Sequence, residues 1–431
     1  MHILLIGNGG REHALAWKLA RSPAASRLSV APGNPGTADE PGATNVAIAP
    51  TDADALVAFA KGEGVGLAVV GPEAPLAAGV ADALRAAGVP TVGPGADGAR
   101  LESSKAFAKD FMVRHGIPTA GHASFTDLAE ALAFVEERGA PIVIKADGLA
   151  AGKGVTVAED LKAARAAVTD ALEGSCFGEA GHRVVIEERL VGEEASFIAL
   201  VDGTRALPLA TSQDHKARDE GDRGPNTGGM GAVSPAPVVT EAVHAHVVAD
   251  ILEPTLRGLA ADGVDFRGFL YVGLMIDRVG AARVVEYNVR LGDPETQPLM
   301  LRLESDLVEL LLACANGELE GVRARWSELA AVGVVVAAGN YPEGSSRGAP
   351  IEGIEAAREA GCEVFHAGTA REDGRLVTDG GRVLCATAAG EGLADARERA
   401  LAGADAIRFP GARHRRDIGH RALDYERLGI G

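Results

Sequence analysis

Short, largely apolar runs separated by glycine-containing turns dominate the first hundred residues. Residues 2–6, 28–31 and 67–70 have the pattern of strands that are buried on both faces of a parallel sheet. The first turn, 7–10, leads into a predicted helix whose N-terminus is a ready site for an anion. Residues 1–100 are therefore predicted to form a βαβ domain whose strand ends make a crevice.

Polar side chains at alternate positions follow a second apolar run near residue 285. Val284 and Val285 are predicted to end a buried strand, and the two-residue repeat of a strand places Glu286, Asn288 and Arg290 on one face. A carboxylate and an amide oxygen are hard ligands of the kind that magnesium takes when it also holds phosphates. At this point a solvated strand edge remains an equal alternative.

A glycine-rich loop, 146–154, lies between two predicted strands. It fails as a Walker A loop, because three residues and not four separate Gly148 from Gly152, no Ser or Thr follows Lys153, and a strand comes next. The pattern favours a hairpin lid with Lys153 at its tip and Lys145 on the entering strand. Its backbone N–H groups are suited to closing over phosphates.

The segment around this loop is predicted to be inserted, since it begins near residue 120 and ends at a strand that runs into Glu187. The exit strand would act as a hinge that reads a base edge, and acids after Gly192 would bind ribose hydroxyls. The loop at 212–231 has five glycines and is too long to be filler, so we interpret it as substrate-binding. His215 is given a binding role at most.

Composition narrows the possible partners. A chain of 431 residues is expected to hold two to four packed units, and its net charge of −18 argues against nucleic-acid and anionic-membrane partners. No apolar run approaches the ~18 residues of a membrane span, and no signal-peptide pattern is present. Four scattered cysteines fit a reducing cytoplasm. A cytoplasmic monomer is expected.

Lysine is scarce in this chain, with eight lysines among 42 basic residues. Arginine poorly replaces a compact, flexible ammonium, so the positions that keep lysine are informative. Lys145 and Lys153 belong to the glycine-rich hairpin, Lys216 lies in the 212–231 loop, and Lys105 is near the start of a predicted helix. The C-terminal cluster 413–416 is interpreted as a solvated patch, with a phosphate-lining role as the alternative.

Several long strings together resemble one family. They are G-N-G-G-R-E-H, G-P-E-A-P-L, K-A-D-G-L-A-A-G-K-G, S-Q-D-H-K, G-P-N-T-G-G-M-G and R-L-G-D-P-E-T-Q. In these strings the chain resembles the phosphoribosylamine–glycine ligases (glycinamide ribonucleotide synthetases) of the ATP-grasp superfamily. The match runs from Met1 to the tail at 415–419.

The resemblance implies an α/β architecture built on the ATP-grasp fold. It implies an N-terminal βαβ (pre-ATP-grasp) domain at 1–100, a central ATP-grasp domain at 101–120 and 188–327, an inserted lid subdomain at 121–187 and a C-terminal α/β domain at 328–431. The implied reaction joins glycine to 5-phosphoribosylamine with ATP through a glycyl phosphate, in de novo purine biosynthesis. The implied cofactors are ATP and Mg²⁺ (or Mn²⁺).

The resemblance also implies roles for individual residues. The catalytic set is Lys105, Lys145, Arg290 and Asp293. The nucleotide set is Lys105, Lys145, Gly148, Ala151, Gly152, Lys153, Gly154, Glu187, Glu188, Leu190, Glu194 and Glu286. The substrate set is Gly9, Gly10, Arg11, Glu12, Glu73, Asp214, Lys216, Pro225, Asn226, Thr227, Gly228, Gly229 and Arg290. The metal ligands are Glu286 and Asn288, and the apolar run 273–276 leaves open whether Glu295 completes the metal shell.

Two further assignments are our own hypotheses. Asp214 and Arg290 would hold the ammonium and carboxylate of glycine, and Gly9, Gly10, Arg11 and the 225–229 loop would hold the sugar phosphate. Three competing functions remain. They are a carboxylase or formate-using transformylase of the same superfamily, a catalytically silent nucleotide-binding module, and a dehydrogenase. The last is disfavoured because Pro32 and Gly33 follow the second strand where a ribose-binding acid is expected.

Overall fold

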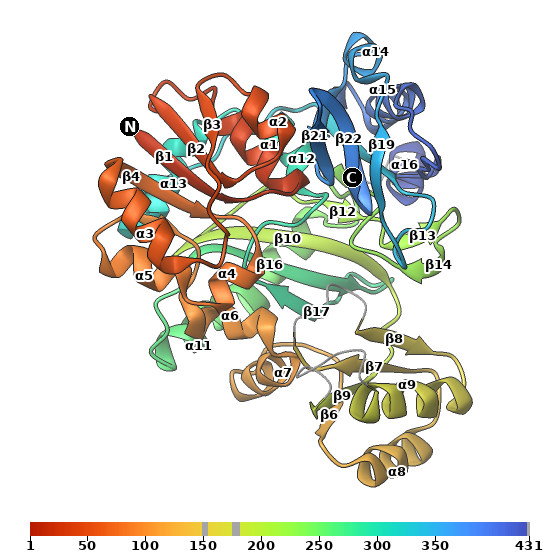
Figure 1. Ribbon diagram of the computed structural model, residues 1–431. Coiled ribbons are helices and arrows are strands. Elements are labelled where there is room, and N and C mark those ends of the chain that lie inside the picture. Colours follow the sequence, from red (N-terminus) through yellow and green to blue (C-terminus); the bar gives the residue numbers. More distant parts are fainter. Residues whose placement is uncertain (149–153, 175–181, 429–431) are drawn as a thin grey trace.

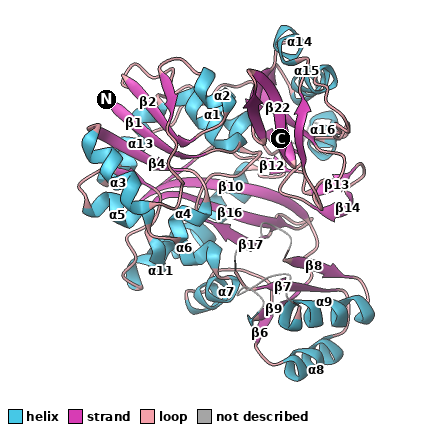
Figure 2. Ribbon diagram, viewed as in Figure 1, coloured by secondary structure: helices cyan, strands magenta, loops and turns pink. Residues whose placement is uncertain are grey.

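The N-terminal unit is a parallel sheet covered by helices (Figures 1 and 2). The computed structural model describes residues 1–148, 154–174 and 182–428. The five strands lie in the order β3-β2-β1-β4-β5 and are β1 (His2–Gly7), β2 (Arg27–Pro32), β3 (Ala43–Asn45), β4 (Val65–Val70) and β5 (Thr91–Val92). The helices are α1 (Gly10–Leu19), α2 (Pro35–Asp39), α3 (Ala53–Gly62), α4 (Glu73–Ala77) and α5 (Val80–Ala86). The strand order reverses between β1 and β4, which places a crevice at their carboxyl ends and confirms the βαβ prediction.

The central unit is an antiparallel sheet with helices packed against it. Its strands, in the order β11-β10-β16-β17, are β10 (Glu193–Asp202), β11 (Ala206–Pro208), β16 (Arg267–Ile276) and β17 (Ala282–Asn288). Its helices are α6 (Ala96–Ser103), α7 (Lys105–Arg114), α10 (Glu241–Val247), the π-helix η2 (Val248–Leu252), α11 (Glu253–Ala261) and α13 (Leu307–Asn316). The intervening α12 (Thr296–Arg302) packs instead against α1 and the C-terminal unit. Phe111, Phe197 and Val284 share one buried cluster, so α7 is fixed to the sheet that carries Glu286.

The lid is a small sheet with its own apolar core, and it projects from the rest of the molecule in Figure 1. Its strands, in the order β6-β9-β7-β8, are β6 (His122–Phe125), β7 (Ile142–Ala146), β8 (Val155–Ala158) and β9 (Val184–Glu188). Its helices are α8 (Leu128–Arg138) and α9 (Leu161–Glu173). The first strand pairs with the last, so the segment does enter and leave at one place, as predicted.

The C-terminal unit contains two sheets. The larger has the order β12-β15-β18-β23-β20, and the smaller has the order β19-β22-β21. The strands that come from the C-terminal segment are β18 (Ala330–Ala337), β19 (Ser346–Pro350), β20 (Glu363–His366), β21 (Thr369–Glu372), β22 (Arg375–Gly380) and β23 (Arg382–Gly390). The helices are α14 (Ile354–Glu359), α15 (Leu393–Ala406) and α16 (His420–Leu428). β20 and β23 pair in the antiparallel sense, and α15 follows them in the chain.

The long segment at 212–231 is more ordered than a loop. It forms β12 (Gln213–Asp214), β13 (Ala217–Asp219), β14 (Arg223–Asn226) and β15 (Gly231–Ser234). β13 and β14 make a hairpin, whereas β12 and β15 join the C-terminal sheet through pairing of β15 with β18. The C-terminal sheet therefore takes two strands from the middle of the chain. Within the described residues, no helix is both long and apolar enough to cross a membrane.

Candidate active site

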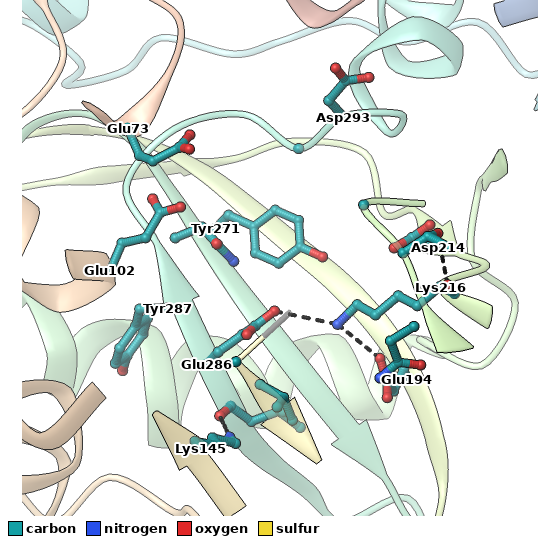
Figure 3. A pocket seen from close by; sticks show the side chains of 18 of the residues that line it. Glu73, Glu102, Lys145, Glu194, Asp214, Lys216, Tyr271, Glu286, Tyr287 and Asp293 are labelled. Carbon is teal, nitrogen blue, oxygen red and sulfur yellow. Dashed lines mark hydrogen bonds and ion pairs between the residues drawn. The ribbon is translucent and has the colours of Figure 1, made fainter. Parts of the chain in front are cut away.

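A cavity of about 1020 Å³ opens where all four units meet. Asn8 and Glu73 line it from the N-terminal unit, Glu286 and Arg290 from the central unit and its following turn, Lys145 from the lid, and Tyr341 and Arg382 from the C-terminal unit. Figure 3 shows acidic and basic side chains facing one another across this space. No single unit contains the site, so its geometry depends on how the units pack.

The structure brings most of the predicted site residues to this cavity. The lining includes Gly9, Arg11, Glu12, Glu73, Lys105, Lys145, Gly148, Gly154, Glu187, Glu188, Leu190, Glu194, Asp214, Lys216, Asn226, Thr227, Gly228, Glu286, Asn288, Arg290 and Asp293. Three predicted residues do not line it: Gly10, Pro225 and Gly229. Three others lie outside the described residues: Ala151, Gly152 and Lys153.

Glu286 is a cavity acid that is surrounded by lysines. It lies on β17 opposite Gly273 of β16, and the pairing register shifts beside it at a bulge. Lys216 contacts its carboxylate at 3.3 Å (Nζ to Oε1), and Lys145 and Lys105 add further positive charge. These lysines, Lys216 foremost, lower the pKa of Glu286 to about 2, so its carboxylate stays ionised.

The cavity end of β17 has the donors that a divalent cation needs. Glu286 and Asn288 both face the cavity, as strand alternation predicted, and offer a carboxylate and an amide oxygen. Among the described residues no three His, Cys, Asp or Glu side chains are grouped as a metal site. Two protein ligands still fit Mg²⁺, which commonly takes its remaining ligands from water and substrate phosphates.

Two lysines from different units border this end of the cavity. Lys105 is the first residue of α7, a helix capped by Ser104, and its Nζ donates to the carbonyl of Gly148 at 2.7 Å. Lys145 lies on β7 and donates to the carbonyl of Val285 at 3.0 Å. The lid strand and the central sheet thus meet directly, beside the predicted metal ligands. Two ammonium groups therefore converge here despite the negative charge of the whole chain.

Glu187 on the exit strand of the lid lies between two buried lysines. Its Oε1 is 3.0 Å from Nζ of Lys145, and its Oε2 is 2.9 Å from Nζ of Lys109. Lys109 also donates to Thr119, and burial lowers its pKa to about 8. We had not predicted Lys109. The signal was present, because Lys109 is a scarce lysine four residues after Lys105 and therefore shares its helix face.

Arg290 is held by Glu73 of the N-terminal unit and Glu102 of α6. Its guanidinium is 2.7 Å from Glu102 and 3.4 Å from Glu73, and it donates to the amide oxygen of Asn288 at 3.0 Å. Against the opposing effect of burial, the two glutamates raise the pKa of Arg290. Glu102 was not predicted. Arg290 therefore ties the strand that carries Glu286 to the N-terminal crevice.

A second group of acids lies on the opposite wall, around Asp214 and Glu295. Glu295 accepts hydrogen bonds from the hydroxyl groups of Tyr271 at 2.8 Å and Ser196 at 3.0 Å. Burial, and then the neighbouring charge of Glu295, raise the pKa of Asp214 well above its usual value. Oδ1 of Asp214 makes no hydrogen bond with any described residue. The wall is suited to a cationic group.

Asp293 connects the central unit to the C-terminal unit. Its carboxylate accepts from Gln297 at 2.8 Å and lies 3.4 Å from Arg382. Arg382, at the start of β23, also donates to the carbonyl of Gly228 at 2.6 Å. Burial alone would raise the pKa of Asp293, but Arg382 and Arg11 lower it overall. Arg382 was missed because it is 89 residues from Asp293 and only the fold brings them together.

The turn between β1 and α1 already contains its own anion. The carboxylate of Glu12 accepts from the Gly9 N–H at 2.7 Å and from Arg11 Nε at 2.5 Å. The Gly9 N–H is therefore engaged within the protein, while the sugar-phosphate role of Gly10 and Arg11 stays a prediction. Arg11 also donates to the carbonyl of Leu291 at 3.1 Å, which fixes this turn to the strand end after Asn288.

Known proteins of one family match this chain along almost its whole length. Residues 103–296 match the family described as phosphoribosylglycinamide synthetase, ATP-grasp (A) domain, and residues 1–102 and 331–421 match its N and C domains. The phosphoribosylamine–glycine ligase of Allochromatium vinosum is 58% identical over 99% of this chain and 100% of the relative. That of Vibrio cholerae is 57% identical over 99% of each chain. The chain belongs to the phosphoribosylamine–glycine ligase family.

Solved structures support the same family and extend the fold beyond it. The phosphoribosylamine–glycine ligase of Thermotoga maritima superposes with a TM-score of 0.83 at 33% identity, covering 97% of this chain and 100% of that one. The biotin carboxylase domain of Hydrogenobacter thermophilus 2-oxoglutarate carboxylase superposes with a TM-score of 0.71 at 16% identity, covering 96% and 91%. That second likeness concerns the fold alone. The ATP-grasp architecture predicted from the sequence is confirmed.

Replacing Glu187 by Gln tests the buried charge cluster. The change leaves Lys109 and Lys145 without their shared carboxylate, and breaking a buried pair from one side typically costs about 3 kcal/mol or more of unfolding free energy. We expect a loss of this size in urea denaturation. The control is Glu136→Gln on α8, whose exposed pair with Arg165 is screened by solvent and should matter little. Equal losses of unfolding free energy in the two variants would contradict the stabilising role of the buried charge cluster.

Acid should destabilise the protein through His215, which is buried and does not line the cavity. Its Nε2 accepts from the Gly419 N–H at 3.0 Å, and burial lowers its pKa to about 3. Below pH 6.5 the unfolded chain binds a proton that the folded chain refuses, so stability falls as pH falls toward 3. The loss is about 2 kcal/mol at pH 5. Urea denaturation at pH 7 and 5 measures it.

The variant His215→Gln keeps an acceptor for Gly419 and removes the titration. Its loss of stability between pH 7 and 5 should be smaller than that of the wild type by about 2 kcal/mol. The partly exposed His246→Gln provides the matched control and should behave as the wild type. Equal acid sensitivity of wild type and His215→Gln would show that His215 is not responsible.

Proposed function

We propose that the protein is an ATP-dependent ligase that joins glycine to 5-phosphoribosylamine through glycyl phosphate. The products are glycinamide ribonucleotide, ADP and phosphate, in de novo purine biosynthesis. Family membership over the full chain supports this function. The observation that carries it is the cavity in which an ionised Glu286 faces Lys105, Lys145 and Lys216. Such an arrangement suits transfer of a phosphoryl group, which requires positioning and charge neutralisation.

ATP would lie between the lid and the central sheet. We assign the adenine to the hinge at Glu187, Glu188 and Leu190, and the ribose to Glu194. The phosphates would be held by Lys105, Lys145 and the backbone of 148–154. Glu286 and Asn288 would hold Mg²⁺, or Mn²⁺, and a divalent ion there would neutralise phosphate charge. The lid contacts support this placement, because Lys105 already bonds to the Gly148 carbonyl across the cleft.

Glycine would lie against the acidic wall. Its ammonium would pair with Asp214, whose Oδ1 is buried without a hydrogen bond to any described residue, and Arg290 would face its carboxylate. Binding a cation favours the ionised carboxyl, so glycine would reverse the raised pKa of Asp214. The carboxylate of glycine is a poor electrophile until a phosphoryl group is added. A closed lid would keep water from the resulting acyl phosphate.

The sugar amine would enter from the N-terminal side. Gly9, Arg11, Glu12 and Glu73 line that side, together with Asn226, Thr227 and Gly228 of the 225–229 loop. The amine nitrogen would form a bond to the glycyl carbon while the bond to the phosphate oxygen breaks, releasing phosphate. Lys105, Lys216 and Arg382 would stabilise the negative charge of the leaving group. Asp293 would act by keeping Arg382 in place.

The cellular setting follows from simpler features. We propose a cytoplasmic monomer with small-molecule partners and neither nucleic acid nor membrane. Three cysteines, Cys314, Cys362 and Cys385, are free and buried, which suits a reducing compartment. The net charge of −18 disfavours polyanionic partners.

Glu286→Gln tests the metal and phosphate assignment. We expect glycine-dependent ADP release to fall by at least ~10²–10³. The fold should survive, because Lys216 keeps Glu194 and Lys145 keeps Glu187 as charge partners. Glu63→Gln, at the surface pair with Arg27, is the control. Near-normal turnover in Glu286→Gln would remove the assignment. Wild-type phosphate release should require glycine, and release driven by bicarbonate or formate would identify a different ligase.

Asp214→Asn tests the glycine site. Loss of the charge partner of an ammonium typically weakens binding by about 10- to 100-fold, so the KM for glycine should rise by that factor. The KM for ATP should change by less than about threefold, because Asp214 is assigned no nucleotide contact. Initial rates with each substrate varied in turn measure both constants. A larger change for ATP would reassign Asp214 to the nucleotide.

A further inference from the structure

The arginine cluster at 413–416 is not the solvated patch that its sequence suggests. The chain from 411 to 421 runs along the β13–β14 hairpin, which lies at the margin of the C-terminal unit in Figure 1. Arg415 is only 1% exposed. A fully buried guanidinium needs partners for its donors, and those partners show what it holds in place.

Arg415 is bonded to both ends of the hairpin. Its Nη1 donates to the carbonyl of Ala217 at 2.9 Å, and its Nη2 donates to Asp222 at 3.0 Å. Asp417 accepts from Nε of Arg415 at 2.8 Å and from its Nη2 at 2.7 Å, and it also accepts from the Gly221 N–H at 2.8 Å. One buried side chain therefore connects the base of β13 with the turn.

The turn of the hairpin is a strained point that these bonds maintain. Asp222 has φ of +55°, in the left-handed region that residues other than glycine rarely adopt. Arg415 and Arg421 both donate to its carboxylate, and His420 lies 3.3 Å from it. A strained backbone conformation persists where the surrounding contacts hold it in place, and such conformations are common at functional sites.

The other end of the hairpin reaches the cavity. Ala217 directly follows Lys216, and Thr227 closes the hairpin by donating its N–H and hydroxyl to the Lys216 carbonyl, each at 2.8 Å. The side chain of Lys216 extends to 3.0 Å from Glu194 and 3.3 Å from Glu286 (Figure 3). A lysine side chain is flexible, so the position of its ammonium depends on a fixed backbone.

We infer that Arg415 is a positioning residue that acts on the reaction through Lys216. It fixes the β13–β14 hairpin from behind, and the hairpin holds the Lys216 ammonium beside Glu286 and Glu194. The inference rests on the proposed function only for its kinetic readout. Arg415 itself lies outside the cavity lining and touches no reacting group.

A double-mutant cycle separates positioning from general stability. Arg415→Met should lower kcat by about 10- to 100-fold, since a misplacement near 1 Å can have that effect. In a Lys216→Met background the same change should cost no more than about twofold, because the route through Lys216 is already lost. Equal losses in both backgrounds would overturn the inference.

Arg416→Met is the matched control. Arg416 neighbours Arg415, but its guanidinium is exposed and pairs with Asp405, so kcat should stay near the wild-type value. Should Arg415→Met fail to fold, Asp222→Asn replaces it, because asparagine tolerates left-handed backbone and still removes the charge that binds Arg415. Asp222→Asn should show the same dependence on Lys216, and an additive loss would count against the inference.

Hydrogen–deuterium exchange provides a readout that needs no turnover. Amides in 213–231 should exchange faster in Arg415→Met than in the wild type, while those of the N-terminal sheet should not change. Unchanged exchange at 213–231 would overturn the inference by itself. If the wild type released no glycine-dependent phosphate, the proposed function would fail, yet exchange would still decide whether Arg415 fixes the hairpin.

Discussion

The structure depends on a balance between lysines and carboxylates at one end of the cavity. Lys216 is paired with Glu194 and Glu286, and Lys145 is paired with Glu187. A charged group that is withdrawn from water is costly unless it is paired. Without a bound triphosphate, the carboxylates of the protein itself pair with these lysines. A chain with a net charge of −18 repels polyphosphate at long range. The positive side chains must therefore converge at short range.

That convergence explains why no unit carries a site of its own. The lysines come from α7, from the lid strand β7 and from the segment between β12 and β13. The acids that hold Arg290 come from the N-terminal unit (Glu73) and from α6 (Glu102), and Arg382 comes from the C-terminal unit. Contacts such as Arg11 with the Leu291 carbonyl connect these units at the cavity wall. The geometry of the site is consequently determined by how the units of this protein pack against one another.

Local pattern predicted the parts of the site that lie on one element. Strand alternation placed Glu286, Asn288 and Arg290 on the cavity side, and the glycine loop between two strands marked the lid. Glu12 shows the limit of local pattern, because its carboxylate turns back onto its own helix start. Sequence alone shows that a helix N-terminus has free N–H groups, but not that a side chain of the protein already accepts hydrogen bonds from them.

Residues fixed by distant segments were beyond sequence reasoning. Arg382 shows no local feature that distinguishes it from other arginines. Its role follows from its hydrogen bonds to the carbonyls of Gly228 and Asp293. Arg415 lies in a run of basic residues, which usually indicates a solvated surface. It is buried because β12 and β15 leave the central segment to join the C-terminal sheet and bring the hairpin with them. Such strand exchange is determined by long-range pairing, which local propensity does not encode.

The long-range contacts also bear on specificity. Biotin carboxylase domains share this fold at 16% identity, so the arrangement of sheets cannot by itself select glycine. Selection must come from side chains that face the substrate, and Asp214 and Lys216 lie on the segment that the C-terminal tail holds. Under the proposed function, the sheet and lid would hold the nucleotide, whereas the hairpin and tail would determine which groups meet the activated acid. A protein could therefore change its substrate by altering that segment while leaving Glu286, Lys105 and Lys145 in place.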